Sequence, residues 1–255
     1  EGSLQPLQRG NIRLAATVML VRDSNEGLQV YMIKRPGRGD FPDLHVFPGG
    51  KLEENDWNPD LCEGLSDEDA SSFMGIESGG LRYWFCVARE CFEECGVLLA
   101  TTADGQFLTS DKRLELASKG RQELLAGTLD WAVFLASNDL VIMTDRLVYF
   151  SHWITPEAAP RRFDTRFFLA AMPEAQKALA DTSETADDGQ WIKPQSALNL
   201  YKEKEWLMID PTLRSLEALV AFDSVEKAIS GVRAAEHVIP WTEDLGRQGM
   251  QPRYS

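Results

Sequence analysis

Histidine, cysteine and long hydrophobic runs are all scarce in this sequence of 255 residues. It has three histidines, and its four cysteines, Cys62, Cys86, Cys91 and Cys95, form no Cys-x-x-Cys pair of the kind that binds zinc. We therefore expect reduced, mostly buried thiols in a cytosol-like compartment. No apolar run reaches the roughly eighteen residues that a membrane span needs, so we expect no membrane partner.

Basic residues are also few compared with acidic ones. The chain has 26 Lys and Arg against 40 Asp and Glu, which gives a formal net charge of −14. A surface this acidic repels a polyphosphate backbone, so we expect no nucleic-acid partner. A small anionic substrate remains compatible with this charge if a metal ion or local arginines bind it.

The hydrophobic pattern predicts one α/β domain over residues 1–255, in which strands and helices alternate without long linkers. Strands are expected at 13–22, 28–35, 45–50, 147–155, 161–173 and 189–194, and helices at 81–96, 111–125, 128–137, 194–203, 211–221 and 223–229. Residues 57–80 are acidic, so we expect a surface insertion with one short helix that contributes little to the core. Residues 194–255 are expected to form a helical C-terminal extension.

The stretch RECFEECGV, residues 89–97, holds three glutamates within five positions of a predicted helix. Spacings of three and four residues place Glu90, Glu93 and Glu94 on one face, where each neighbouring like-charge pair costs about 0.2–0.5 kcal/mol. In so acidic a chain, a solvated helix surface is the simplest interpretation. Two observations favour a site: almost no lysine or arginine is spaced to neutralise the trio, and a strand ending in Gly49–Gly50 precedes it. Such dense carboxylate oxygens suit Mg²⁺ or Mn²⁺, which also bind substrate phosphates.

These motifs resemble the Nudix box, Gly-x5-Glu-x7-Arg-Glu-U-x-Glu-Glu-x-Gly-U, where U is apolar. Gly50 matches the opening glycine, and residues 89–97 match every specified position of the second half. Asp56 stands where the box has its first glutamate, and the 32 residues 57–88 replace the seven of the motif. The resemblance implies a Nudix-type α/β/α sandwich with a mixed sheet and an insertion inside the box.

The resemblance also implies a metal-dependent hydrolase of nucleoside diphosphate derivatives. Glu90, Glu93, Glu94 and the carbonyl of Gly50 are then expected as ligands of Mg²⁺ or Mn²⁺, and Arg89 as the residue that orients the glutamates. A further glutamate, Glu184, is expected as a base or ligand, although Asp187 or Asp188 fits that loop as well. The role of Asp56 stays open.

One branch of the family, the coenzyme A diphosphatases of the peroxisomal type and their bacterial relatives, interrupts its box at the same place. This similarity favours coenzyme A or acyl-CoA as substrate, cleaved to 3′,5′-ADP and 4′-phosphopantetheine. Substrate-binding candidates are five arginines: Arg35, Arg38, Arg161, Arg162 and Arg166. Guanidinium groups match phosphate geometry, but salt bridges to the acidic surface explain the last three equally well.

Two other functions stay open on the sequence alone. One is hydrolysis of ADP-ribose, a dinucleotide or a nucleotide sugar, and the other is a non-catalytic ligand-binding regulator on the same scaffold. The chain is expected to be a monomer or homodimer. His45 and His152 are interpreted as structural residues. The final residues Arg253-Tyr254-Ser255 are not a peroxisomal targeting tripeptide, so we expect a cytoplasmic, bacterial protein.

Overall fold

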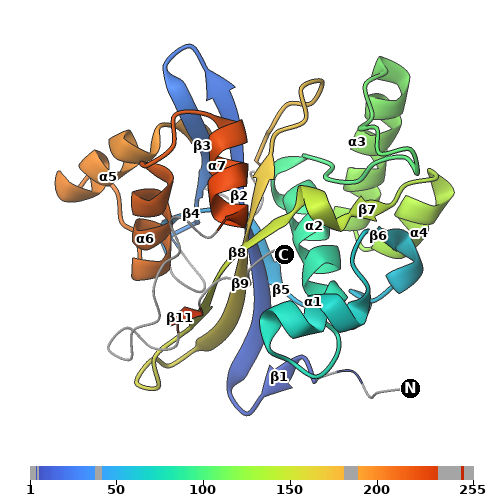
Figure 1. Ribbon diagram of the computed structural model, residues 1–255, viewed down its shortest axis with the longest axis horizontal. Helices are drawn as coiled ribbons and strands as arrows, with labels where there is room; N and C mark the ends of the chain where they lie inside the picture. The colour runs from blue at the N-terminus through green and yellow to red at the C-terminus, as the bar shows by residue number, and fades with distance from the viewer. Residues whose placement is uncertain (1–3, 5, 38–41, 181–188, 235–247, 250–255) are drawn as a thin grey trace.

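A central mixed β-sheet lies between two layers of helices in the computed structural model of the protein (Figure 1). The structure describes residues 4, 6–37, 42–180, 189–234 and 248–249. Helices α1 to α4 cover one face of the sheet, and helices α5 to α7 cover the other. The expected α/β/α sandwich and its helical C-terminal part are therefore confirmed.

The sheet has the strand order β10-β3-β2-β9-β8-β11, with β1 and β5 also paired to β2 and β4 paired to β3. Its strands are β1 (Gln8–Arg9), β2 (Ile12–Ser24), β3 (Gly27–Lys34), β4 (His45–Val46), β5 (Gly49–Lys51), β8 (Val148–Ile154), β9 (Arg162–Ala171), β10 (Gln190–Ile192) and β11 (Gln248–Gly249). Strands β2 and β9 run parallel through ten register pairs from Ile12↔Arg162 to Val21↔Ala171, whereas the other pairs in this sheet are antiparallel.

Strand β2 separates two hydrophobic cores because successive side chains point to opposite faces of a strand. The first core lies beside helix α2, which carries the second half of the box pattern and is called the box helix below; the residues of β2 that face this core are Leu14, Ala16, Val18 and Leu20. Met19 and Val21 face the second core, beside the C-terminal helices. Burial on both faces explains why this strand reads as one nearly continuous apolar run.

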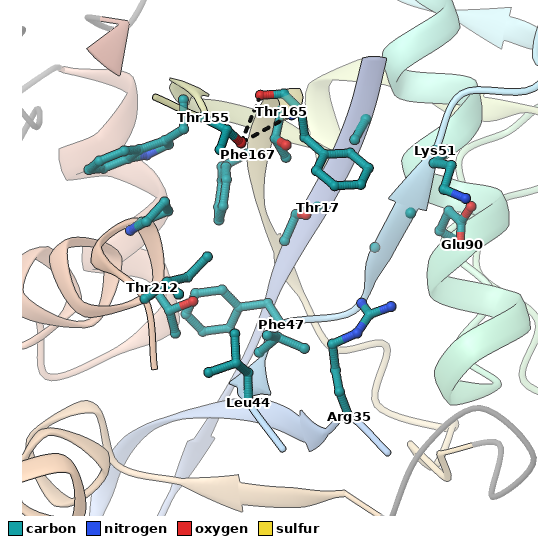
Figure 2. Close-up of a pocket in the computed structure, with 18 of the residues that line it drawn as sticks. Thr17, Arg35, Leu44, Phe47, Lys51, Glu90, Thr155, Thr165, Phe167 and Thr212 are labelled. Atoms are coloured by element: carbon teal, nitrogen blue, oxygen red, sulfur yellow. Dashed lines mark hydrogen bonds between the residues drawn. The ribbon is translucent and has the colours of Figure 1, made fainter. Parts of the chain in front are cut away.

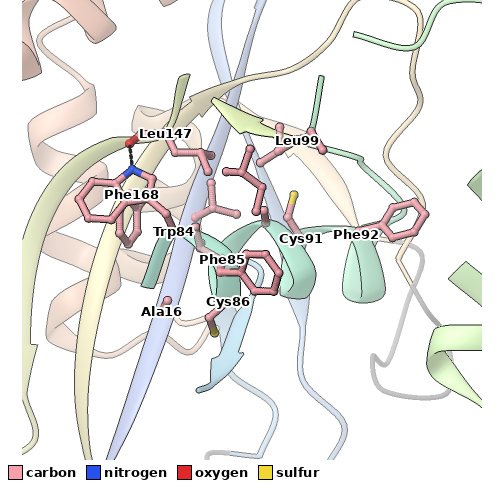
Figure 3. Close-up of a cluster of buried hydrophobic side chains, with 14 of the residues drawn as sticks. Ala16, Trp84, Phe85, Cys86, Cys91, Phe92, Leu99, Leu147 and Phe168 are labelled. Atoms are coloured by element: carbon pink, nitrogen blue, oxygen red, sulfur yellow. Dashed lines mark hydrogen bonds between the residues drawn. The ribbon is translucent and has the colours of Figure 1, made fainter. Parts of the chain in front are cut away.

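The box helix α2 (Leu81–Cys95) packs its apolar side against the sheet (Figure 3). Trp84 is fully buried, and its indole N–H donates to the carbonyls of Thr144 and Leu147. Gly96 ends the helix in the left-handed conformation, with φ 71°. On the same face lie α3 (Asp111–Leu125) and α4 (Trp131–Ser137). Helix α4 begins three residues later than expected, because the Asp130 carboxylate accepts hydrogen bonds from the N–H groups of Ala132 and Val133.

The insertion, residues 57–80, contains the expected short helix, α1 (Asp67–Met74), together with a 3₁₀ turn (Pro59–Leu61) and strand β6 (Cys62–Glu63). Strand β6 pairs in parallel with β7 (Ile142–Met143), which precedes a second 3₁₀ turn (Thr144–Arg146). The expectation that the insertion contributes little to the core is wrong. Ala70 is 0% and Met74 6% exposed within the first core, and Trp57, Leu61, Cys62, Leu65 and Ile76 pack against it.

The C-terminal helices are α5 (Pro194–Lys202), α6 (Asp210–Leu219) and α7 (Val225–Arg233). The loop between α5 and α6 attaches to the edge strand β4. The His45 N–H donates to the Leu207 carbonyl over 2.8 Å, and the His45 ring stacks on Trp206 with centroids 3.9 Å apart. His45 is therefore a structural residue that fixes this loop.

Candidate active site

Arg89 is the centre of a buried ion-pair network on the box helix. Its Nε and Nη2 atoms donate to the two carboxylate oxygens of Asp56 over 2.8 and 2.9 Å, and Nη1 donates to Glu93 over 2.8 Å. Nη1 also lies 3.1 Å from Glu90, and Nη2 donates to the Lys51 carbonyl. Burial opposes the charge on Arg89, but the hydrogen bonds to Asp56 prevail and raise its pKa. Arg89 thus contacts two of the three box glutamates, Glu90 and Glu93.

Asp56 belongs to this network although it is one carbon shorter than the glutamate of the box pattern. It is 1% exposed, and its Oδ2 also accepts the backbone N–H of Glu53 over 2.8 Å. A two-pronged contact with a guanidinium fixes both partners in one plane. Asp56 therefore fixes the position of the Arg89 guanidinium and of the backbone at Glu53.

Two glycines in strand β5 allow close approach of its neighbours: Gly50 allows that of the box helix, and Gly49 allows that of strand β2. A Cβ atom on Gly50 would lie 2.4–2.5 Å from the carboxyl group of Glu90, and one on Gly49 would lie 2.4 Å from the Ala16 carbonyl oxygen. Neither position has room for a side chain. The Gly49 N–H donates to Glu94 Oε2 over 2.7 Å, which fixes that carboxylate at the strand end.

Glu90 and Glu94 line a cavity of about 1000 Å³ together with Gly49 and Gly50 (Figure 2). The pKa of Glu90 is raised well above its usual value, first by burial and then by the charges of Glu94, Glu93 and Asp56. The charge of Arg89 opposes this shift but does not cancel it. Carboxylates that are desolvated and crowded in this way favour a bound cation. Their oxygen donors suit a hard ion such as Mg²⁺ or Mn²⁺, so the residues present fit the metal that the box implies.

Glu93 is placed differently from the other two glutamates. Its carboxylate pairs with Arg89, and the residue lines a separate cavity of about 320 Å³ with Asp56 and Asp130. Within the described ranges, no group of three or more His, Cys, Asp or Glu side chains is arranged to hold a metal ion. The cavity-facing donors are therefore Glu90 and Glu94, next to the Gly50 backbone.

The cavity lies on the face of the sheet that carries the C-terminal helices. Its walls come from strands β2, β4, β5, β8 and β9, from Arg35 and Pro36 after β3, and from residues 208–212, which include the end of the α5–α6 loop and the first turn of α6. Lys51 and Arg35 are its basic lining residues among those described. Glu90 and Glu94 of the box helix reach this cavity next to Gly49 and Gly50 of strand β5.

The arginine cluster does not enter this cavity. Arg166 is 3% exposed and faces the box-helix side, where it donates to the Tyr149 hydroxyl and the Met74 carbonyl. Arg162 donates to the Thr155 carbonyl, and Arg161 is exposed but does not line the cavity. Strand periodicity explains the placement: Phe163, Thr165 and Phe167 face the cavity, so residues 162, 164 and 166 face away. The structure therefore gives no support to a phosphate clamp made of these three arginines.

Several sequence candidates lie elsewhere. Arg38 and Glu184 are outside the described residues. His152 lies 2.6 Å from Asp164 through Nε2, which is a structural contact on the side away from the cavity. All four cysteines are free, and Cys86, Cys91 and Cys95 are buried, as the sequence predicts.

Sequence reasoning missed Lys51 and the loop residues Met208 and Ile209, which line the cavity. Lys51 follows the two glycines directly, so its position was available from the motif. Met208 and Ile209 carry no such signal, because two apolar residues before Asp-Pro are ordinary for a helix start.

A family model, that of the NUDT19 Nudix domain, matches residues 78–219, which is more than half of the chain. The chain belongs to the Nudix family. The matched region includes the second half of the Nudix box, with Arg89 and the three glutamates. It also includes the loop between α5 and α6, so the Nudix match covers both Glu90 and Glu94 and the cavity residues 208–212.

Known Nudix proteins resemble the chain over most of its length. The acyl-coenzyme A diphosphatases NUDT19 of Xenopus laevis and Homo sapiens are 25% and 27% identical to it, covering 81% and 78% of this chain. The chain spans only 63% and 62% of the length of those two relatives. A solved NUDIX hydrolase from Alicyclobacillus acidocaldarius is 26% identical, with a TM-score of 0.72, over 86% of this chain and 96% of that one. Among the described residues, no helix is long and apolar enough to cross a membrane.

Proposed function

We propose that the chain is a Mg²⁺- or Mn²⁺-dependent diphosphatase that cleaves coenzyme A or its acyl esters to 3′,5′-ADP and 4′-phosphopantetheine or its acyl derivative. The observation that carries this proposal is the position of Glu90 and Glu94 at the glycine-lined end of a cavity of about 1000 Å³. Ligand cavities usually measure about 300–1,000 Å³, so this one suits a large ligand. The NUDT19 relatives, which are named as acyl-CoA diphosphatases, support the same substrate class.

Glu90, Glu94 and the Gly50 carbonyl would hold the metal ion, and Glu93 is the further ligand that the box pattern implies. When bound, such an ion neutralises diphosphate charge and lowers the pKa of a coordinated water. Arg89 keeps the carboxylates in place through its contacts with Glu90 and Glu93. Glu184 remains the candidate for a base or further ligand.

Arg35 and Lys51 would bind the phosphate oxygens of the substrate. Both line the cavity, and Figure 2 shows Lys51 next to Glu90 and Arg35 extending from the strand below. A charge-assisted hydrogen bond of this kind contributes about 1.5–3 kcal/mol. Since the chain has a net charge of −14, these local cations are needed to hold an anion beside the glutamates.

Hydrolysis places a water oxygen on one phosphorus and breaks that atom's bond to the bridging oxygen. The bridging oxygen leaves with the other phosphate. The four free cysteines fit a reducing cytoplasm, where coenzyme A would be accessible. Nothing in this chemistry needs a second protein, which agrees with an active monomer or homodimer.

The test is a panel of coenzyme A, dephospho-coenzyme A, ADP-ribose and NADH, assayed with Mg²⁺ and with Mn²⁺, with products separated by chromatography. We expect coenzyme A to be cleaved fastest and Glu94→Gln to lower kcat by at least about a hundredfold, because a neutral amide holds the metal poorly. Glu68→Gln, an exposed acid on α1, is the matched control and should retain full activity.

Three results would contradict the proposal. Faster cleavage of ADP-ribose or NADH would replace coenzyme A with a general nucleoside diphosphate substrate. Turnover that needs no divalent ion, or that survives in Glu94→Gln, would remove the metal assignment. A folded, metal-loaded protein that binds all four compounds and cleaves none would be a regulator.

A further inference from the structure

The large cavity has two chemically different halves. Figure 2 shows Lys51 and Glu90 together beside β5, whereas Leu44, Phe47 and Thr212 lie across the cavity from them, with Arg35 between the two groups. The half away from Glu90 is lined by large apolar side chains, among them Leu44, Phe47, Trp153, Phe167, Met208 and Ile209. One end therefore suits phosphates, and the other suits a hydrocarbon group.

The far wall of the apolar half is residues 208–212, which we call the loop wall. Met208 is 7% exposed and packs into the second core, whereas Ile209 is 38% exposed at the cavity. The wall follows Trp206 and Leu207, which are fixed to β4 by the His45 ring stack and by the His45 N–H bond to the Leu207 carbonyl. The wall is therefore held by contacts that do not involve the Ile209 side chain.

The charges decide which end of a coenzyme A thioester lies at the loop wall. Asp210 is the charged residue of the wall, and it is an acid. Of the described basic lining residues, Lys51 lies beside Glu90, and Arg35 lies between Glu90 and the apolar half. The 3′,5′-ADP end carries the phosphates and is repelled by Asp210, whereas the thioester end is uncharged.

We propose that the loop wall binds the acyl group of an acyl-CoA substrate and that Ile209 sets the preferred chain length. This inference rests on the proposed function and makes it more specific: free coenzyme A is the poorer substrate. A fully buried methylene adds about fourfold in affinity, so preference should rise with chain length until the tail fills the apolar half.

The experiment measures kcat/KM for coenzyme A and for its straight-chain esters of two to eight carbons. Wild type should favour the eight-carbon ester over free coenzyme A by at least about tenfold. Ile209→Ser should reduce that ratio to near one. Ile209 occupies the N-cap of α6, where serine is a favourable residue, so this variant keeps the fold. Ile209→Trp should move the optimum to a shorter chain, an effect that a purely structural role would not produce.

Leu207→Ser is the matched control. Leu207 is 54% exposed in the same loop and does not line the cavity. The ratio of kcat/KM for the eight-carbon ester to that for free coenzyme A should therefore be the same in Leu207→Ser as in wild type. Dissociation constants measured in metal-free buffer give the same ratio without turnover. They separate a failure of this inference from a failure of the proposed reaction.

A wild-type ratio near one overturns the inference, and so does a ratio retained in Ile209→Ser or lost in Leu207→Ser. If Ile209→Ser instead weakens coenzyme A and every ester by one common factor, the wall holds the shared part of the substrate, such as adenine, and the inference is wrong.

Discussion

The insertion and the C-terminal helices flank the sheet on opposite sides, and they are attached by different kinds of contact. The insertion combines apolar packing in the first core with polar, directional contacts: Asp67 accepts the N–H group of Leu81 at the start of α2, and the Arg166 side chain donates to the Met74 carbonyl. The C-terminal helices are joined mainly by apolar packing, with Leu216, Leu219, Ala228 and Val232 in the second core.

This difference separates two tasks. Polar contacts at the start of α2 fix the position of the helix that carries the glutamates, because hydrogen bonds depend on angle and distance. Apolar packing is non-directional, so the C-terminal side keeps its place while its loop side chains vary. Under the proposed function, the first side positions the glutamates, and the second side lines the space for the rest of the substrate.

The largest effect should come from replacing residues 57–80 with a short Gly/Ser linker. The first core would lose Ala70 and Met74 as well as the side chains packed on it, and α2 would lose the acceptors at its first turn. We expect an insoluble or molten product, measured by near-UV circular dichroism and calorimetry. A linker variant that melts cooperatively near wild type would show that the two flanks do not differ in this way.

Asp56→Ala tests the buried charge network on the same flank. Removing one partner of a buried ion pair costs about 3–5 kcal/mol, because Arg89 would keep its charge without its two-pronged acceptor. The free energy of unfolding from urea titration should fall by about that amount, and kcat should fall with it. Glu54→Ala, an exposed acid two residues earlier, is the control and should change neither.

Asp67→Ala should have a smaller effect, because it removes only the acceptor for two N–H groups at the start of α2. Loss of such a cap costs about 0.5–2 kcal/mol. Asp67→Asn should recover part of this loss, since the amide oxygen still accepts. If Glu68→Ala on the exposed side of α1 destabilises the protein equally, the cap explanation fails.

The smallest effect expected is a pH dependence of stability. Burial lowers the pKa of His152. Burial alone would raise the pKa of Asp164, but the hydrogen bond from His152 and the charges of His152, Arg166 and Arg9 outweigh it, so the pKa of Asp164 is lowered as well. Both shifts favour the deprotonated form in the folded state, so this stability is present above the unfolded pKa values and is lost as pH falls. Between pH 7.5 and 5.5 the melting temperature should decline slightly, through the His152 contribution, and less in His152→Gln. An equal decline in His152→Gln would assign the effect to other groups.

Local pattern predicted most of the elements. The box helix was expected at 81–96 and lies at Leu81–Cys95, and the helix expected at 111–125 is found at Asp111–Leu125, because apolar periodicity and capping residues are local signals. The same helix geometry predicted that the three glutamates lie on one side of this helix, away from its apolar face. The arginine cluster shows where local pattern fails: three arginines within six residues look like one patch, but residues 162 and 166 share a strand face that points away from the cavity.

The insertion shows a second limit. Its acidic composition suggested a surface insertion that adds little to the core, yet a few apolar residues at the right spacing, such as Ala70 and Met74, bury one side of its short helix α1. Likewise, Ile209 of the loop wall lies 159 residues after Gly50 of β5, so only the tertiary fold reveals that the two border one cavity.

The attachment of the loop wall has a consequence for how such a chain can change over generations. The bond that fixes it joins two main-chain groups, the His45 N–H and the Leu207 carbonyl. A backbone N–H group is present at position 45 with every residue except proline, and a backbone carbonyl is present at position 207 with all of them. If Ile209 sets chain length as proposed, lineages can exchange that side chain and inherit new substrate ranges while the box helix on the other side of the sheet is left unaltered.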